Sequence, residues 1–222
     1  MRNKRKHLFW PAVGFLAAFI FWTLAVCFAD VQPIGPQASA VGFASLNHSF
    51  HTLTGVHMVL YHITDWLSIL PICFSLGFAV LGLVQWIRRR HLLRVDADIL
   101  ILGCFYLVVF AAYAFFESCV INYRPILING NLEASYPSST TLLVLCIMPT
   151  AGMQLSRRIK NRRCSRFVTA AITVFTVFMV IGRLLSGVHW LTDIIGGVLL
   201  SAGLCGLYHA CITYVTTRLS AQ

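Results

Sequence analysis

Three polar side chains between two apolar stretches have the types and spacing for chemistry on an anion. Arg183, His189 and Asp193 lie where almost every neighbouring residue is apolar. An ionisable residue near a membrane interior costs roughly 2.5–3.5 kcal/mol on insertion scales, so its presence indicates a function. His189 and Asp193 are four residues apart and share a helix face, where the carboxylate can orient the imidazole. Arg183 carries a planar fork suited to phosphate oxygens. The alternative is a salt-bridged hairpin that holds two helices together.

The composition is that of a membrane protein. Of the 222 residues, 58% are hydrophobic and 11% are charged, and the mean hydropathy is +0.78. An ordinary soluble domain is less apolar and more charged. The eight cysteines include no CxxC pair and no zinc spacing, so we expect neither a disulfide framework nor a metal site. The net charge of +10 would suggest nucleic acid in a soluble protein, but the placement of the charges favours a membrane role, without a nucleic-acid partner.

Six apolar stretches are long enough to cross a bilayer. We therefore predict an all-α fold, a bundle of six transmembrane helices that forms a single integral membrane domain over 1–222. Between the first two stretches, apolar residues at helical spacing predict an outer interfacial helix over about 41–66, in which Asp65-Trp66 is an interface anchor. The first stretch is long enough to span and ends without a clear cleavage site, so we expect it to be retained. The six predicted spans lie at about 8–29, 67–87, 99–116, 138–154, 167–185 and 191–213.

The positive charges predict the orientation. Fifteen of the seventeen Lys and Arg residues lie before the first span, after the sixth, or in the loops that follow the second and fourth spans. By the positive-inside rule these segments are cytoplasmic, so we expect both termini on the cytoplasmic side. We expect the membrane to be a bacterial inner membrane. The other two cations, Arg124 and Arg183, fall on the outer, periplasmic side, which topology usually depletes of positive charge.

A helix start on the same outer side adds a third polar segment. Pro137-Ser138-Ser139-Thr140-Thr141 opens the fourth span, and proline followed by hydroxyl residues indicates a helix N-terminus. The free N–H groups of such a start can bind an anion without any charged side chain. Taken alone, the segment is explained as well by plain helix capping. Its position beside Arg124, Arg183 and His189 favours the anion site.

These three segments resemble the signature of the type-2 phosphatidic acid phosphatase family of membrane enzymes. That signature is Lys-x6-Arg-Pro, then Pro-Ser-Gly-His, then Ser-Arg-x5-His-x3-Asp. The order, spacing and side of the membrane agree over nearly all of 1–215. The corresponding segments here are Glu117-x6-Arg124-Pro125, Pro137-Ser138-Ser139-Thr140 and Gly182-Arg183-x5-His189-x3-Asp193.

The resemblance implies a helical-bundle phosphatase whose site lies at the outer membrane face and needs neither metal nor cofactor. It implies that His189 attacks phosphorus and forms a phosphohistidine, with Asp193 orienting the imidazole. Binding and charge neutralisation are the main protein contributions to phosphoryl transfer. The residues that the resemblance assigns to phosphate binding are Arg124, Arg183, Ser138 and Ser139.

Two departures bear on activity. The family lysine is Glu117 here, and the family histidine that protonates the leaving group is Thr140. General acid catalysis is worth roughly 10²–10⁴-fold. The substrate could have a leaving group that needs little protonation, or Glu117 could act as the acid with its pKa raised by an apolar site. Glu117 could equally brace Arg124 or Arg183. A third interpretation is a catalytically silent relative that binds phospholipid or isoprenoid phosphate without hydrolysis.

We therefore expect a lipid phosphatase or phosphotransferase whose partner is a phosphorylated lipid of the bilayer. The candidate substrates are an isoprenoid diphosphate, such as undecaprenyl diphosphate, and a phosphatidate-type lipid. The diphosphate is slightly favoured because its leaving group is a phosphate with a second pKa of roughly 6. The intact pair of His189 and Asp193 favours an enzyme over a silent binder, since binding alone needs no oriented imidazole. A transporter or channel would need ionisable residues at mid-membrane, and the spans contain few.

Overall fold

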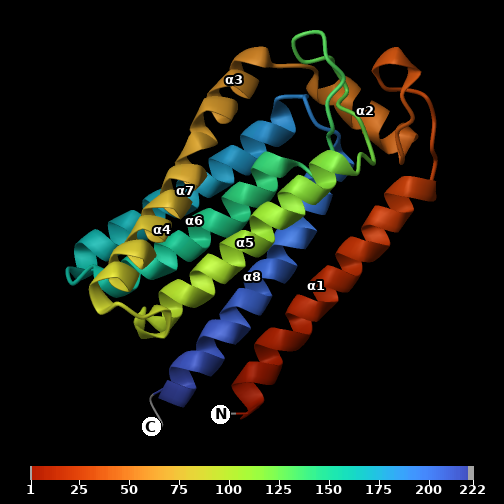
Figure 1. Ribbon diagram of the computed structural model, residues 1–222. Coiled ribbons are helices and arrows are strands. Elements are labelled where there is room, and N and C mark those ends of the chain that lie inside the picture. Colours follow the sequence, from red (N-terminus) through yellow and green to blue (C-terminus); the bar gives the residue numbers. More distant parts are fainter. Residues whose placement is uncertain (1, 220–222) are drawn as a thin grey trace.

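The computed structural model describes residues 2–219 and, of these, the side chains of 9–216. The described part is a bundle of helices, and six helical segments are long and apolar enough to cross a membrane. The prediction of an all-α membrane protein with six spans is therefore confirmed. The elements, shown in Figure 1, are α1 (Arg2–Phe28), η1 (Pro36–Ala38), α2 (Ala44–Thr54), α3 (Met58–Leu67), α4 (Ile69–Arg89), η2 (Leu92–Arg94), α5 (Ala97–Ser118), α6 (Ser139–Arg158), α7 (Arg162–Leu185) and α8 (Leu191–Leu219).

The bundle has two chemically different ends. The start of α1 and the end of α8 lie at one end, near the α4–α5 and α6–α7 connections (Figure 1), and we call this the basic end. Its ion pairs join Arg89 to Asp96 at 2.8 Å and Arg158 to Asp98 at 3.0 Å. The opposite end carries α2 and the long α5–α6 loop, and we call it the site end. The terminal cations used to predict orientation, Arg2, Lys4, Arg5, Lys6 and Arg218, have side chains outside the described part.

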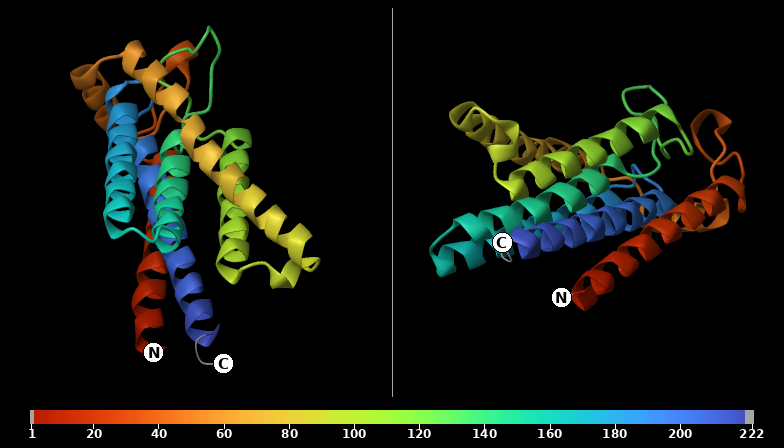
Figure 2. Two further views of the ribbon diagram at one scale, coloured as in Figure 1. Left: turned by 90° about the vertical axis from the view of Figure 1, so that its left-hand side faces the viewer. Right: turned by 60° about the horizontal axis from the view of Figure 1, so that its bottom comes forward.

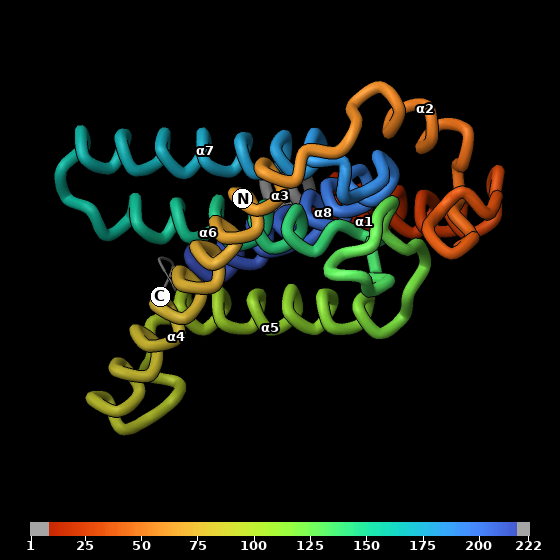
Figure 3. The backbone as a smooth tube through the Cα atoms, turned by 90° about the horizontal axis from the view of Figure 1, so that it is seen from above, coloured from red at the N-terminus to blue at the C-terminus, as the bar shows by residue number. Residues whose placement is uncertain are grey.

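Helix α6 forms the centre of the bundle. It contacts α4, α5, α7 and α8, and the view from above shows it between α5 and α7 (Figure 3). Leu142, Ile147 and Ala151 are buried in the main hydrophobic cluster. The buried Thr150 lies 3.2 Å from the hydroxyl of Tyr106 on α5, as a buried polar group requires. This packing fixes the start of α6, and with it the Ser138–Thr140 segment, relative to the neighbouring helices.

The predicted outer helix over 41–66 is two helices in the structure, α2 and α3. The break lies at Gly55, whose φ is +68°, and there the chain meets the α7–α8 turn. A Cβ atom on Gly187, which has φ +69°, would lie 2.0 Å from the carbonyl oxygen of Gly55, so only glycine fits. The N–H of His57 donates to the carbonyl oxygen of Ser186 at 3.0 Å. Contact with the α7–α8 turn thus interrupts the helix.

The second membrane segment begins earlier than predicted. Helix α3 continues into α4 with only Ser68 between them, and together they form a single apolar segment, Met58–Arg89. Helix α3 packs on α7, and α4 on α5 and α6. Figure 2 shows α3 and α4 crossing the bundle as one arm that diverges from it toward the basic end. As a consequence, side chains of α3 contact Arg183 on α7, although the two segments lie far apart in the sequence.

Candidate active site

The imidazole of His189 is held on one side by a serine and a carboxylate. The hydroxyl of Ser135 lies 3.0 Å from Nδ1 of His189 and donates to Oδ2 of Asp193. The direct distance from Nδ1 to that oxygen is 3.8 Å. With Ser135 donating to the carboxylate, its oxygen accepts from Nδ1–H of His189, which fixes the tautomer with a free lone pair on Nε2. Nε2 is buried and has no hydrogen-bond partner, so it is the nitrogen available for attack on a substrate.

The turn that carries His189 is held by contacts with the start of α8, with the α5–α6 loop and with α2. Oδ2 of Asp193 accepts from the backbone N–H of Trp190 at 2.9 Å. The indole N–H of Trp190 donates to the carbonyl oxygen of Tyr123 at 2.7 Å, which ties the turn to the α5–α6 loop. Asn47 on α2, fully buried, donates to the hydroxyl of Thr192 at 2.9 Å and accepts from its N–H at 3.2 Å. The start of α8 is therefore rigidly placed.

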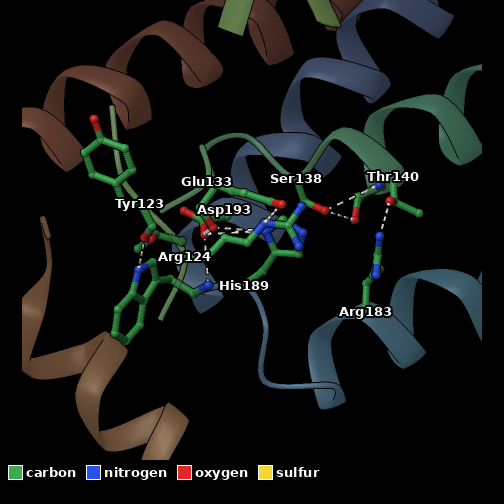
Figure 4. A network of polar contacts seen from close by, with 12 residues as sticks. Tyr123, Arg124, Glu133, Ser138, Thr140, Arg183, His189 and Asp193 are labelled. Carbon is green, nitrogen blue, oxygen red and sulfur yellow. Dashed lines mark hydrogen bonds and ion pairs between the residues drawn. The ribbon is translucent and has the colours of Figure 1, made fainter. Parts of the chain in front are cut away.

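Arg183 lies between α3 and the start of α6. Its Nη2 donates to Oδ1 of Asp65 at 2.9 Å and to the hydroxyl of Thr140 at 2.8 Å, and Figure 4 shows it reaching from α7 to Thr140. Its Cζ lies 5.0 Å from the ring centroid of Tyr61, a cation–π distance. Nε is buried without a partner. The guanidinium is held in place and still has hydrogen-bonding capacity for an anion.

Arg124 lies in the α5–α6 loop beside a second carboxylate. Its Nε is 3.2 Å from Oε2 of Glu133, and Nη1 is buried without a partner. A short backbone pairing of Tyr123 with Ala134 holds the two sides of the loop together. The Cζ of Arg124 lies 6.0 Å from the ring of Tyr61, so one tyrosine lies beside both arginines. The two sequence-predicted phosphate ligands are thus brought together.

Ser138 and Ser139 differ in position. Ser138 is the N-cap of α6 and accepts from the hydroxyl of Thr141 at 3.0 Å. Its N–H donates to the carbonyl oxygen of Asp193 at 3.0 Å, and the whole residue is buried. Ser139 instead lines a cavity at the site end. Capping, the alternative considered from sequence, is therefore a role that Ser138 performs.

The cavity has a volume of about 580 Å³ and lies between the α3–α4 arm, α5 and the start of α6. Five sequence-predicted residues line it: Glu117, Arg124, Ser139, Thr140 and Arg183. Three others, Ser138, His189 and Asp193, are not among its lining residues. Two further carboxylates, Asp65 and Glu133, also line it. In the described part of the chain, the ion pairs of the two arginines are made by these carboxylates and not by Glu117.

Helices α4 and α5 also line a second, apolar cavity. It measures about 490 Å³ and lies between the halves of these helices nearer the basic end, Ser75–Trp86 of α4 and Ile99–Phe110 of α5. Ile72 and Tyr113 of the first cavity lie one helical turn or less from those residues. A polar space at the site end therefore adjoins an apolar groove, which is the arrangement a lipid headgroup and its chain require.

Comparison with known proteins identifies the family. The sequence profile of the PAP2 superfamily matches residues 105–217, about half of the chain, including all three signature segments. The chain belongs to the PAP2 superfamily. A solved structure with the same fold is the "first transmembrane PAP2 type phosphatidylglycerolphosphate phosphatase from Bacillus subtilis", at 19% identity and a TM-score of 0.59. The match covers 92% of this chain and 96% of that one. A search of curated proteins finds no significant match.

The superfamily match and the six apolar helices make this chain an integral membrane protein of the PAP2 superfamily. Within this PAP2 fold, His189 has an electrostatic setting suited to a nucleophile. Burial lowers its pKa well below the usual value, and the positive charges of Arg124 and Arg183 lower the pKa further. The imidazole is therefore neutral at neutral pH, which is the form with a lone pair to attack phosphorus.

Sequence reasoning missed four residues of the site. Ser135 and Glu133 lie in the α5–α6 loop, just before the second signature segment, and Tyr61 and Asp65 lie on α3. The usable signal was that Glu133 and Ser135 are polar residues close to a site motif on the predicted outer side. Asp65 had a signal too, as an acidic residue facing a membrane segment, but it was interpreted as an interface anchor.

Proposed function

We propose that this PAP2 protein removes a phosphate group from a membrane lipid through a phosphohistidine on His189. The observation that carries the proposal is the state of the imidazole: Nδ1 is held by Ser135, while Nε2 is buried without a partner. A structural histidine would have both nitrogens bonded. Nearby, each arginine keeps a buried nitrogen without a partner, which suits the charge that spreads over phosphoryl oxygens in the transition state.

Each site residue has a role in the proposed reaction. Arg124 and Arg183 bind the phosphoryl oxygens, and Ser139 lines the same cavity. Nε2 of His189 attacks phosphorus. Asp193, through Ser135, holds Nδ1 and stabilises the imidazolium that forms. Water or a second lipid then accepts the phosphoryl group. By the charge-based orientation, the site end faces the outside, or periplasm, and the substrate reaches it from the outer leaflet.

The substrate candidates are an isoprenoid diphosphate and a phosphatidate-type lipid. Thr140 lines the cavity where the family has its general acid, and a threonine hydroxyl does not supply a proton at neutral pH. A diphosphate tolerates this absence because its leaving group is a phosphate. The rival function is a silent relative that binds a lipid phosphate. It is favoured by the carboxylates of Asp65 and Glu133, which already pair with the two arginines.

The test is phosphate release by the purified full-length protein in detergent. Undecaprenyl diphosphate and phosphatidate would each be supplied with and without EDTA. We expect release that EDTA does not inhibit and that His189→Ala abolishes. His48→Ala, an exposed histidine of α2 outside the cavity, is the matched control and should retain wild-type activity. Release that His189→Ala leaves intact would contradict the mechanism, and binding of lipid without release would establish the silent relative.

A further inference from the structure

The apolar cavity between α4 and α5 takes no part in the proposed reaction, and we call it the α4–α5 groove. At the basic end it is bounded by Leu92 and Val95, which belong to the connection between the two helices. Side chains that line it are open to the surroundings of the bundle, since Leu76 is 60% and Leu107 72% exposed. Both helices lie in membrane-length apolar segments, so those surroundings are hydrocarbon.

The length of the groove matches one leaflet of a bilayer. Along α5 it runs from Ile99 to Phe110, which is about 16 Å of helix at roughly 1.5 Å per residue. Half of a hydrocarbon core that is roughly 30 Å thick is about 15 Å. The groove therefore extends from about the middle of the membrane to its surface at the basic end. By the charge-based orientation this is the cytoplasmic leaflet.

Arginine side chains with no ion-pair partner surround the end of the groove. Asp96, the carboxylate of this connection, is 2.8 Å from Arg89 and accepts from Gln85 at 2.8 Å. The other arginines are exposed and form no ion pair with any described side chain. The end of the groove therefore carries positive charge that the protein itself does not neutralise. The arginines of the α4–α5 connection are Arg88, Arg89, Arg90 and Arg94.

Two of these arginines lie in line with the groove. Arg90 ends α4 four residues after Trp86, so it continues the helix face that lines the groove. Arg94 precedes Val95, which also lines the groove. Arg88 instead follows Val84 by four residues, on a face outside the lining. The lining residues of α4 that share a face with Arg90 are Leu76, Ala79, Leu83 and Trp86.

We propose that the α4–α5 groove binds an acyl chain of an anionic phospholipid from the leaflet at the basic end, with the lipid phosphate at Arg90 and Arg94. This site is separate from the cavity beside Arg124 and Arg183, and the inference does not rest on the proposed function. Guanidinium groups bind phosphate oxygens through paired hydrogen bonds, and basic pockets between membrane helices bind anionic headgroups.

The charge favours a lipid over a second copy of the chain as the occupant. A second copy in the same membrane orientation has its own arginines at the same depth, so packing of the two grooves would bring like charges together. An anionic lipid neutralises them instead. It also fills the space beside α5 where the α3–α4 arm diverges from the bundle (Figure 2).

The first test compares two lipids that have the same oleoyl chains and differ in net charge. Delipidated full-length protein in detergent would be titrated with phosphatidylglycerol and with phosphatidylethanolamine, and bound lipid measured by native mass spectrometry. We expect one phosphatidylglycerol to bind about tenfold or more tightly. Arg90→Gln and Arg94→Gln should each weaken its binding about fivefold and leave phosphatidylethanolamine unaffected. Arg88→Gln, from the same connection, is the matched control and should bind as wild type.

A second pair of variants tests the chain-binding part. Gly103 lines the groove, and a Cβ atom there has no neighbouring atom within 4 Å, so Gly103→Leu fills the groove without a clash. We expect it to weaken both lipids about tenfold. Gly77 on α4 has equally open space but does not line the groove, so Gly77→Leu is the control. Both substitutions favour a helix, which keeps folding comparable.

Four results would overturn the inference. They are equal affinity for the two lipids, an equal loss in Arg88→Gln, unchanged binding in Gly103→Leu, or a lipid-free dimer, in which a second copy covers the groove. Lipid binding that Gly103→Leu weakens but Arg90→Gln and Arg94→Gln do not would assign the groove to the chain of a substrate at the site end, and would overturn it too. His189→Ala tests only the proposed function and should bind phosphatidylglycerol as wild type does.

Discussion

The surroundings of His189 and the cavity beside Arg124 and Arg183 are built in opposite ways. Ser135, His189 and Asp193 are almost completely buried and bond to one another from a loop, a turn and a helix start that other segments fix. The cavity instead has half-exposed carboxylates, and their ion pairs can be exchanged for contacts with a ligand. Under the proposed function, the difference suits a division of work in which the buried part holds the nucleophile, and the cavity binds the phosphate and selects the lipid.

The division follows the chain only in part. His189 and Asp193 lie within the PAP2 match over residues 105–217, and so do the two arginines. Asp65 and Tyr61 come from α3, which lies before that range, and they reach Arg183 only because α3 packs on α7. The first half of the chain thus adds side chains to a site that the second half defines. Substitutions around His189 and substitutions in the cavity should therefore differ in kind, with loss of kcat in the first and altered preference in the second.

The largest effect is expected at the carboxylate behind His189. Asp193→Asn keeps the shape but replaces the acceptor of both Ser135 and the Trp190 N–H, so the tautomer of His189 is no longer fixed. We expect kcat to fall roughly 10²–10⁴-fold with little change in KM. Asp98→Asn, which removes an aspartate from the ion pair at the basic end, is the matched control and should retain activity. A kcat of Asp193→Asn close to wild type would show that His189 needs no carboxylate.

The second-largest effect is expected for Ser135, which lies between His189 and Asp193. Ser135→Ala removes the hydroxyl that joins Nδ1 of His189 to Asp193, and a lost orienting partner typically costs roughly 10–100-fold. We expect the loss in kcat, and Ser135→Thr, which keeps the hydroxyl, to recover most of it. Ser201→Ala, a buried serine that bonds within α8, controls for general packing. If Ser135→Ala lowers stability but not kcat, the serine is only structural.

A gain of about tenfold is expected on the cavity side. Thr140→His restores a proton donor at the position where the family has one, and a general acid matters most for a plain alkoxide leaving group. Activity on phosphatidate should rise, whereas activity on a diphosphate, whose leaving group is a phosphate, should change little. Equal gains on all substrates would contradict the link between Thr140 and leaving-group chemistry.

The smallest effect is a shift in pH dependence. In the proposed mechanism neutral His189 is the active form, and its lowered pKa favours that form as the pH falls below the usual value of 6.5. Arg124→Gln removes one of the two positive charges that lower this pKa, so the pKa should rise and the acidic limb of kcat/KM should move to higher pH. An acidic limb that stays in place or moves to lower pH would show that this limb does not report His189.

Much of the fold and part of the site could be predicted from the sequence. The six spans follow from length and hydropathy, which act locally, and His189, Asp193, Arg124 and Arg183 follow from fixed spacings. The break at Gly55 could not be predicted, because it depends on contact with Gly187 more than 130 residues away. For the same reason the partners of the arginines were missed: Glu117 was the nearest carboxylate in the motif, but Glu133 and Asp65 are nearest in space.

The most direct test of the account is to trap the phosphoenzyme. Wild type, His189→Ala and His48→Ala would be mixed briefly with a ³²P-labelled lipid phosphate, quenched in alkali and digested for peptide mapping. The account predicts an acid-labile, alkali-stable label on the peptide that contains His189, absent in His189→Ala and retained in His48→Ala. Phosphate release at wild-type rate without that label, or a label on another residue, would contradict it.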